Sequence, residues 1–230
     1  MRYAQYPLMM FAAGFGTRMK HLTQDRPKPL VNVEGRPLID HALDLAKGAE
    51  CGPIAANLHY LADRLEHHLT GTGVTTITEL PEILDTGGGL RNALPVLGDG
   101  PVMTLNPDAI WDGPNPLDML RAAWRPDKMD ALLICVPIAQ TVGRMGTGDF
   151  DLNSDDQISR GTDFVYGGAQ IVKTDGLRDI AETSFSLNIL WDQLSAKDRL
   201  FGLRYPGRWC DVGTPEGVSL AESMLRDAHG

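Results

Sequence analysis

The chain has 230 residues, of which 43% are hydrophobic and 22% are charged, and its formal net charge is −9. This length and composition are typical of one globular α/β domain that buries a sizeable core. The negative charge argues against a nucleic-acid partner, because general nucleic-acid binders carry a basic face. It does not exclude a nucleotide, since a few cations can reverse the electrostatic field within one cleft.

Two features predict a cytoplasmic protein without a membrane partner. The three cysteines are odd in number and lack the spacing of metal ligands, which is typical of reduced thiols. The apolar run over residues 8–13 is too short for the core of a secretion signal, and no stretch approaches the roughly 18 apolar residues of a membrane span.

Stretches that suit strands alternate with amphipathic stretches that suit helices in the first part of the chain. The predicted elements after the first apolar run are, in chain order, a helix over 37–47, a strand over 53–58, a helix over 60–69, a strand over 74–79, a helix that ends near 94, a strand over 101–105, a helix over 117–124 and a strand over 130–138. Such alternation is typical of a parallel α/β sheet.

The pattern changes near residue 141, where glycine and aspartate become frequent and short alternating runs predict hairpins. A strand over 164–172 is interrupted by a glycine pair, and a helix is expected over 186–194. One or two strands over 200–210 precede a last helix that begins at Thr214 and Pro215. We interpret the change as a new lobe within one unit.

The first apolar run leads into a turn that contains Gly14 and Gly16, followed by Arg18 and by Lys28 between two prolines. Glycines let backbone N–H groups approach phosphate oxygens, and nearby cations neutralise their charge. The turn lacks the third glycine of a dinucleotide fingerprint and the Gly-Lys-Ser/Thr of a Walker loop. By itself it also fits a plain strand-to-helix turn with two solvated cations, although the flanking prolines would hold Lys28 at a defined place.

Two further motifs follow predicted strands. Residues 87–89 are three consecutive glycines, and we do not expect packing alone to explain them. They indicate a backbone that approaches a flat partner or adopts positive φ. The alternative is that they are the glycine-rich start of a helix. Asp108 and Asp211 each follow a predicted strand, where open α/β sheets bind ligands. Taken singly, either aspartate also fits a loop or cap residue.

The segment A-A-G-F-G-T-R-M, followed by P-K-P-L-V-N-V-E-G-R-P-L-I, resembles the signature of the sugar-1-phosphate nucleotidyltransferases. With the later motifs the resemblance spans nearly the whole chain. It implies a Rossmann-like nucleotide-binding α/β fold with a mixed, mostly parallel central sheet and a small sugar-binding lobe. It also implies Mg²⁺-dependent transfer of a nucleotidyl group from an NTP to a sugar 1-phosphate, with the nucleotide bound by about residues 1–140 and the sugar and metal by about 141–230.

The resemblance implies roles for individual residues. Arg18, Lys28 and Asp108 would be catalytic, Asp108 and Asp211 would bind Mg²⁺, and Asp149 and Gly168 would bind the sugar. The implied nucleotide-binding residues are Ala12, Ala13, Gly14, Gly16, Thr17, Arg18, Lys28, Asp85, Thr86, Gly87, Gly88 and Asn106. One departure is Pro107, which stands where the family usually has glycine and removes an N–H next to the metal aspartate.

Within the family, the resemblance is greatest to the uridylyltransferases that act on N-acetylmuramate 1-phosphate in peptidoglycan recycling. It implies UTP as the favoured nucleotide. A mannose-1-phosphate guanylyltransferase or another hexose-1-phosphate nucleotidyltransferase is the alternative, because no side chain in residues 79–91 separates UTP from GTP or dTTP. A non-catalytic, nucleotide-sensing regulatory subunit is a third hypothesis, which retention of both cations and both aspartates disfavours.

Overall fold

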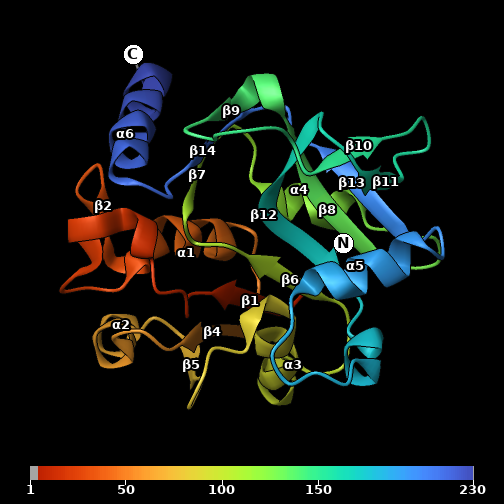
Figure 1. Ribbon diagram of the computed structural model, residues 1–230, viewed down its shortest axis with the longest axis horizontal. Coiled ribbons are helices and arrows are strands. Elements are labelled where there is room, and N and C mark those ends of the chain that lie inside the picture. Colours follow the sequence, from red (N-terminus) through yellow and green to blue (C-terminus); the bar gives the residue numbers. More distant parts are fainter. Residues whose placement is uncertain (1–4, 230) are drawn as a thin grey trace.

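Strand β1 (Leu8–Phe11) lies within a nine-stranded sheet in the computed structural model, which describes residues 5–229 (Figure 1). It pairs in parallel with β4 (Ile54–Leu58) on one side and with β6 (Val102–Leu105) on the other. β4 in turn pairs in parallel with β5 (Val74–Thr78). The parallel strands therefore end at one common edge, where the loops that follow them gather.

The other strands and the helices complete a mixed α/β fold with a mostly parallel central sheet, as predicted. The large sheet also contains β8 (Ala131–Pro137), β10 (Phe150–Leu152), β11 (Ile158–Arg160), β12 (Phe164–Val172) and β13 (Leu200–Arg204). A three-stranded sheet contains β7 (Ala109–Asp112), β14 (Arg208–Asp211) and β9 (Thr141–Val142), and β2 (Asn32–Val33) pairs with β3 (Arg36–Pro37).

Helices flank the sheet and short 3₁₀ helices occur in the connections. The α-helices are α1 (Leu38–Gly48), α2 (Ala62–Leu69), α3 (Asp85–Leu97), α4 (Pro116–Ala123), α5 (Leu187–Ser195) and α6 (Pro215–His229). The 3₁₀ helices are η1 (Thr17–Thr23), η2 (Lys28–Leu30), η3 (Ile138–Gln140) and η4 (Asp175–Asp179). Within residues 5–229, no helix combines the length and apolar character that crossing a bilayer requires.

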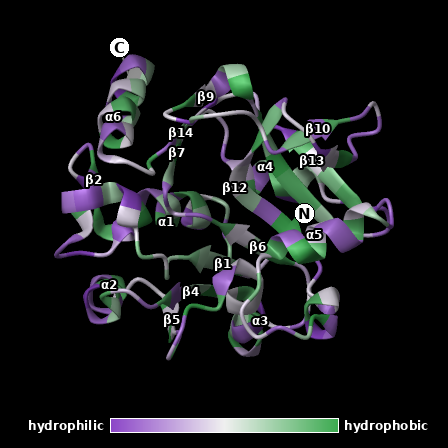
Figure 2. Cartoon of the chain, viewed as in Figure 1, coloured by the Kyte–Doolittle hydropathy of each residue, from purple (hydrophilic) through white to green (hydrophobic). Residues whose placement is uncertain are grey.

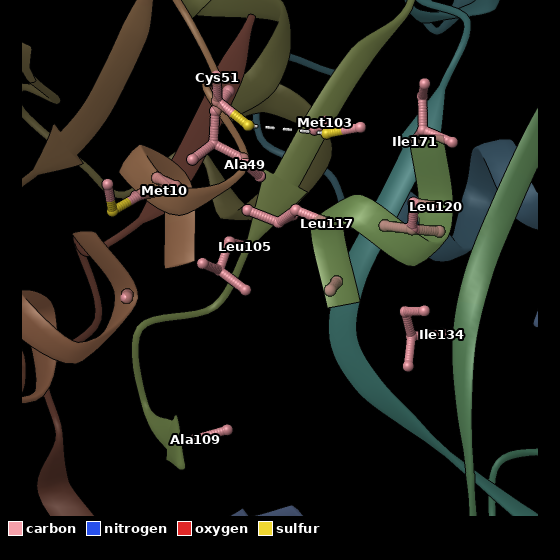
Figure 3. Close-up of a cluster of buried hydrophobic side chains, with 14 of the residues drawn as sticks. Met10, Ala49, Cys51, Met103, Leu105, Ala109, Leu117, Leu120, Ile134 and Ile171 are labelled. Atoms are coloured by element: carbon pink, nitrogen blue, oxygen red, sulfur yellow. Dashed lines mark hydrogen bonds between the residues drawn. The ribbon is translucent and has the colours of Figure 1, made fainter. Parts of the chain in front are cut away.

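Alternate residues of β1 point to opposite faces of the sheet, and both faces are apolar. Leu8 and Met10 pack in a cluster with side chains of α1, α2 and α4, whereas Met9 packs in a second cluster with side chains of α3 and α5. Figure 3 shows part of the first cluster, in which Leu117 and Leu120 of α4 lie near the sheet. In Figure 2, hydrophobic colour is concentrated in the central strands, which are covered on both faces.

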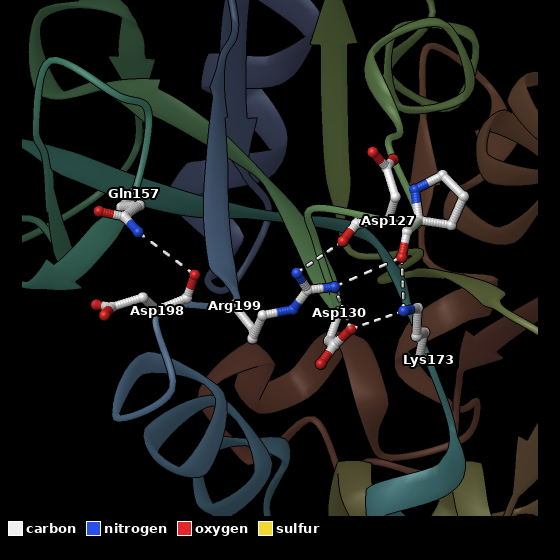
Figure 4. A network of polar contacts seen from close by, with 7 residues as sticks. Asp127, Asp130, Gln157, Lys173, Asp198 and Arg199 are labelled. Carbon is white, nitrogen blue, oxygen red and sulfur yellow. Dashed lines mark hydrogen bonds and ion pairs between the residues drawn. The ribbon is translucent and has the colours of Figure 1, made fainter.

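A charged network ties together the ends of three strands at the amino end of β8 (Figure 4). Asp130 pairs with Lys173 at 2.7 Å and with Arg199 at 2.9 Å. Burial raises the pKa of Asp130, but hydrogen bonds from Arg199 and Lys173 outweigh it and lower the pKa below its usual value. The network joins the start of β8, the end of β12 and the start of β13, and so stabilises the sheet at the amino end of its longest fully buried strand.

The consecutive glycines at 87–89 lie inside the first turns of α3 and are buried. None of them has positive φ; it is Asp85 that does, at 59°. A Cβ on Gly87 would lie 2.3 Å from the Phe185 ring, and a Cβ on Gly88 would lie 2.4 Å from the carbonyl oxygen of Thr183. The expectation that packing could not explain this run is therefore wrong: segment 183–185 packs onto Gly87 and Gly88, and the side chains of Glu79 and Asn57 pack onto Gly89.

We expect the substitution Gly88→Ala to lower the free energy of unfolding by about 1–3 kcal/mol, because its methyl group would force the backbone of segment 183–185 away from α3. Chemical denaturation measures the change. Gly100→Ala is the matched control, since a Cβ at Gly100 would meet nothing within 4 Å and should leave stability nearly unchanged. Equal denaturation midpoints for the two variants would contradict this account of the glycine run.

Candidate active site

The loop that follows β1 is held against Lys28. Gly16 adopts φ of 63°, and a Cβ there would lie 2.8 Å from the Cβ of Lys28. The carbonyl oxygen of Gly16 accepts hydrogen bonds from the N–H of Met19 at 2.9 Å and from the Thr23 hydroxyl at 3.0 Å. Because glycine alone avoids both the steric contact and the strain of positive φ, the loop can close over Lys28.

Lys28 is not a solvated surface cation. Its side chain is 12% exposed, and its Nζ donates to Oδ2 of Asp108 at 2.7 Å. The prolines on either side are buried and fix the backbone as it enters η2. The structure therefore brings the predicted lysine directly to the first predicted metal aspartate. Arg18, in contrast, lies on the exposed surface of η1.

Asp211 and Asp108 are brought together by the pairing of β14 with β7. In this antiparallel ladder Asp211 lies opposite Ala109, and the N–H of Val212 donates to the carbonyl oxygen of Asp108 at 3.0 Å. Arg18 reaches the same place, because a Cβ on Gly213 would lie 3.0 Å from Oδ1 of Asp211 and 3.2 Å from Nη1 of Arg18. Two carboxylates and two cations from distant segments thus share one corner of the fold.

The pKa of the Asp211 carboxyl is raised above its usual value. Burial is the main cause, and the negative charge of Asp108 adds to it; the charges of Lys28, Arg18 and Arg144 act in the opposite direction. Ionising Asp211 beside Asp108 is therefore unfavourable unless additional positive charge is present. This is the environment in which a carboxylate pair favours a divalent cation.

The side chains at this corner suit Mg²⁺ better than a metal ion whose ligands all come from the protein. Within residues 5–229 no group of three or more His, Cys, Asp or Glu side chains is placed to hold a metal ion. Mg²⁺ is commonly bound by one or two carboxylates and completes its coordination with water and substrate phosphates. Asp108 and Asp211 supply such a pair, while the neighbouring cations are available for the phosphates.

A cleft of about 230 Å³ opens beside this corner at the carboxyl ends of β1, β4 and β6. Its lining residues are Phe11, Ala13, Gly14, Asn57, Ile83, Asp85, Thr86, Asn106 and Asp108. Six of these are predicted site residues, and Phe11, Asn57 and Ile83 are not. A polar Asn57 near the end of an otherwise apolar strand is the signal that could have identified one of the three.

A buried polar bridge connects the glycine loop to the start of α3. The Asn57 side chain accepts from the N–H of Ala12 at 2.8 Å and donates to Glu79 Oε1 at 2.8 Å. The other carboxyl oxygen of Glu79 accepts from the N–H of Leu84 at 2.8 Å. Asn57 and Glu79 are 4% and 1% exposed, so this bridge fixes the two walls of the cleft relative to one another.

The predicted base-binding residues divide into two groups. Asp85 and Thr86 line the cleft. Gly87 and Gly88 face away toward Phe185, whose carbonyl oxygen accepts hydrogen bonds from both of their N–H groups, at 2.8 and 3.1 Å. The hydroxyl of Thr86 also accepts from the N–H of Leu187 at 3.0 Å. These contacts fasten α3 to the segment that leads into α5.

The two predicted sugar residues occupy different surroundings. Gly168 adopts φ of 85° in the bulge of β12 and lies against Asn106, whose N–H donates to its carbonyl oxygen at 2.8 Å. Asp149 accepts at Oδ1 from Arg144 Nη2 and at Oδ2 from the N–H of Tyr166, both at 2.9 Å. Gly168 therefore adjoins the cleft through Asn106, while Asp149 orients an arginine.

Comparisons with known proteins identify a family and relatives of this chain. A family model described as the MobA-like NTP transferase domain matches residues 9–143. An N-acetylmuramate alpha-1-phosphate uridylyltransferase of Caulobacter vibrioides is 38% identical over 96% of this chain and 97% of the relative. A protein of the same name from Neisseria meningitidis is 30% identical over 94% of this chain and 96% of the relative.

Solved structures share the fold. A putative glucose-1-phosphate thymidylyltransferase from Bacillus anthracis superimposes with a TM-score of 0.80 at 15% identity and covers 96% of each chain. HddC from Yersinia pseudotuberculosis, solved in complex with GMP-PN, superimposes with a TM-score of 0.77 at 22% identity and covers 96% of this chain and 100% of its own. At these identities the likeness concerns the architecture.

We expect Asp211→Asn to raise the melting temperature by about 2 °C near pH 7.5 in the presence of a chelator. A raised folded-state pKa contributes stability at low pH that is lost as the pH rises through that pKa, so the ionised carboxylate destabilises the fold at neutral pH. The gain should shrink as the pH is lowered from 7.5, because the raised pKa means that Asp211 becomes protonated in the folded state before it does in the unfolded chain.

Thermal unfolding followed by circular dichroism across this pH range measures the effect. Asp192→Asn is the matched control, because that carboxylate is exposed and pairs with Arg160 at the surface. A gain for Asp211→Asn that does not vary with pH, or a loss of stability near pH 7.5, would show that the charge of Asp211 is not the cause.

Proposed function

The chain belongs to the MobA-like NTP transferase family, and from that premise we propose that it transfers a uridylyl group from UTP to N-acetylmuramate 1-phosphate and releases pyrophosphate. Both relatives described above carry this activity in their names and align over more than nine-tenths of the chain. The observation that carries the proposal is the convergence of Lys28, Arg18, Asp108 and Asp211 beside the glycine loop. A cytoplasmic role in peptidoglycan recycling would follow from this acceptor.

The acceptor supplies the nucleophile. One of its phosphate oxygens attacks the α-phosphorus of UTP in line, the new P–O bond forms, and the bond to pyrophosphate breaks. No side-chain base is needed, because the acceptor phosphate is already an anion. Catalysis of this kind depends on positioning and on charge stabilisation. The nucleotide belongs in the cleft, with its base toward Asp85 and Thr86.

Each cation has a separate task in this scheme. Lys28, held at Asp108 by its ion pair, neutralises charge at the α-phosphate. Arg18 and the backbone of residues 14–17 bind the β- and γ-phosphates, since Arg18 projects from the start of η1 beside Asp211. Gly168 and Asn106 border the space beyond the α-phosphate, where the acceptor sugar would bind.

Asp108 and Asp211 are the residues that would hold Mg²⁺. When bound, the ion would neutralise the negative charge that gathers where the acceptor phosphate meets the α-phosphate. Pro107 is compatible with this role because its ring is buried and fixes the backbone before Asp108. The residues around the pair complete the charge balance, with Lys28 on Asp108 and Arg18 near Asp211.

A substrate panel tests the proposal. The purified protein is incubated with Mg²⁺ and each of UTP, GTP and dTTP against N-acetylmuramate 1-phosphate, mannose 1-phosphate and glucose 1-phosphate, and pyrophosphate release is measured. We expect the highest kcat/KM for UTP with N-acetylmuramate 1-phosphate. Preference for GTP with mannose 1-phosphate would replace the substrate assignment, and nucleotide binding without pyrophosphate release for every pair would indicate a regulatory protein.

We expect Lys28→Ala and Asp108→Asn each to lower kcat by about 10²–10³-fold, because each removes a charge close to the reacting phosphates. Asp44→Asn is a matched control: this carboxylate pairs with Arg36 on the exposed face of α1 and should leave kcat unchanged. Circular dichroism checks that all variants are folded. Rates within twofold of the unmodified protein for either site variant would exclude its assigned role.

A further inference from the structure

The loop after β9 brings a third cation, Arg144, close to Asp211. β9 pairs in parallel with β14, with Thr141 opposite Trp209 and Val142 opposite Cys210. The chain then turns at Gly143, which has φ of 73°, and a Cβ there would lie 2.9 Å from the carbonyl oxygen of Asp211. The backbone that leads into Arg144 therefore lies directly beside the backbone of Asp211, the second predicted metal ligand.

Asp149 orients the Arg144 guanidinium, whose other N–H donors are not used by this ion pair. Its Nη2 donates to Asp149 at 2.9 Å, and Asp149 is itself held by the N–H of Tyr166. The Nε of Arg144 is buried and has no hydrogen-bond partner within the part of the chain that the structure describes. A guanidinium has five N–H donors, and a plain ion pair with Asp149 would leave most of them unused.

Arg144 and the other two cations come from different parts of the fold. Lys28 and Arg18 approach from the glycine-loop side, where the nucleotide phosphates belong. Arg144 approaches from the lobe after residue 140, which also carries Gly168. In the proposed function this lobe holds the acceptor sugar, so Arg144 comes from the acceptor's part of the fold.

We propose that Arg144, oriented by Asp149, binds an oxyanion of the sugar 1-phosphate acceptor. The proposal rests on the proposed function and specifies its acceptor side. N-acetylmuramate 1-phosphate carries two such groups, the phosphate and the carboxylate of its lactyl ether. Both match the fork of N–H donors that a guanidinium presents, and an ammonium matches neither as well.

Steady-state kinetics with both substrates varied tests the role of Arg144. We expect Arg144→Gln to raise the acceptor KM about tenfold or more and to leave the UTP KM within about twofold. Arg144→Lys should give an intermediate acceptor KM, because it retains the charge without the bidentate geometry. Arg160→Gln is the matched control, since Arg160 pairs with Asp192 on the exposed surface of the same lobe. An unchanged acceptor KM in Arg144→Gln overturns the proposal, as does an equal rise in both KM values.

A second acceptor identifies which oxyanion is bound. N-acetylglucosamine 1-phosphate has the same phosphate but no lactyl carboxylate. If Arg144 binds the phosphate, Arg144→Gln raises the KM of both acceptors by the same factor. If it binds the carboxylate, only the KM of N-acetylmuramate 1-phosphate rises, and the variant loses its discrimination between the two.

Calorimetric titration separates failure of this inference from failure of the proposed function. N-acetylmuramate 1-phosphate is titrated into the unmodified protein and into Arg144→Gln in the presence of Mg²⁺. A weaker Kd for the variant supports binding by Arg144 even if no uridylyl transfer is detected. Equal Kd values overturn the inference even if the unmodified protein turns over UTP with this acceptor.

Discussion

The site depends on holding two carboxylates together where burial and mutual repulsion disfavour it. The β7–β14 ladder does this, because Asp211 lies opposite Ala109 and the N–H of Val212 bonds to the backbone of Asp108. The rise in the pKa of Asp211 records the electrostatic cost. Lys28 and Arg18 offset part of that cost, and the substrates and Mg²⁺ of the proposed reaction would bring further charges to the same point. Perturbed pKa values of this kind cluster at functional sites, so the raised pKa of Asp211 is consistent with the proposed role of the pair.

Close approach of backbone to functional side chains is the second constraint, and glycines satisfy it. Gly16 lets the loop close over Lys28, Gly168 lets the bulge of β12 lie against Asn106, and Gly213 leaves room for Arg18 beside Asp211. In each case a Cβ would come within about 3 Å of a site residue. Charged and polar groups that must converge on a small substrate need this space, which explains why the glycines surround the site.

Rigid coupling between the walls of the cleft comes from buried polar groups. Asn57 and Glu79 connect the glycine loop to the start of α3, and the carbonyl oxygen of Phe185 connects α3 to the segment before α5. Buried and satisfied hydrogen bonds of this kind define one arrangement of the backbone. Nucleotidyl transfer needs little chemistry from the protein beyond such positioning, so these contacts matter to the rate as well as to stability.

Local patterns in the sequence were enough to predict the fold class and the family, and both predictions are confirmed. Strand and helix periodicities indicate an α/β sheet, and the segment from Gly14 to Arg18 together with the Pro-Lys-Pro motif resembles the family. Which residues meet depends on tertiary contacts that no local pattern encodes. The prediction for the glycines of α3 was wrong because the residues that pack on Gly87 and Gly88, Thr183 and Phe185, lie far along the chain. The sequence analysis did not single out Asn57 or Arg144 for the same physical reason: strand pairing brings Asn57 to the cleft beside Asp108 and the loop that carries Arg144 to Asp211.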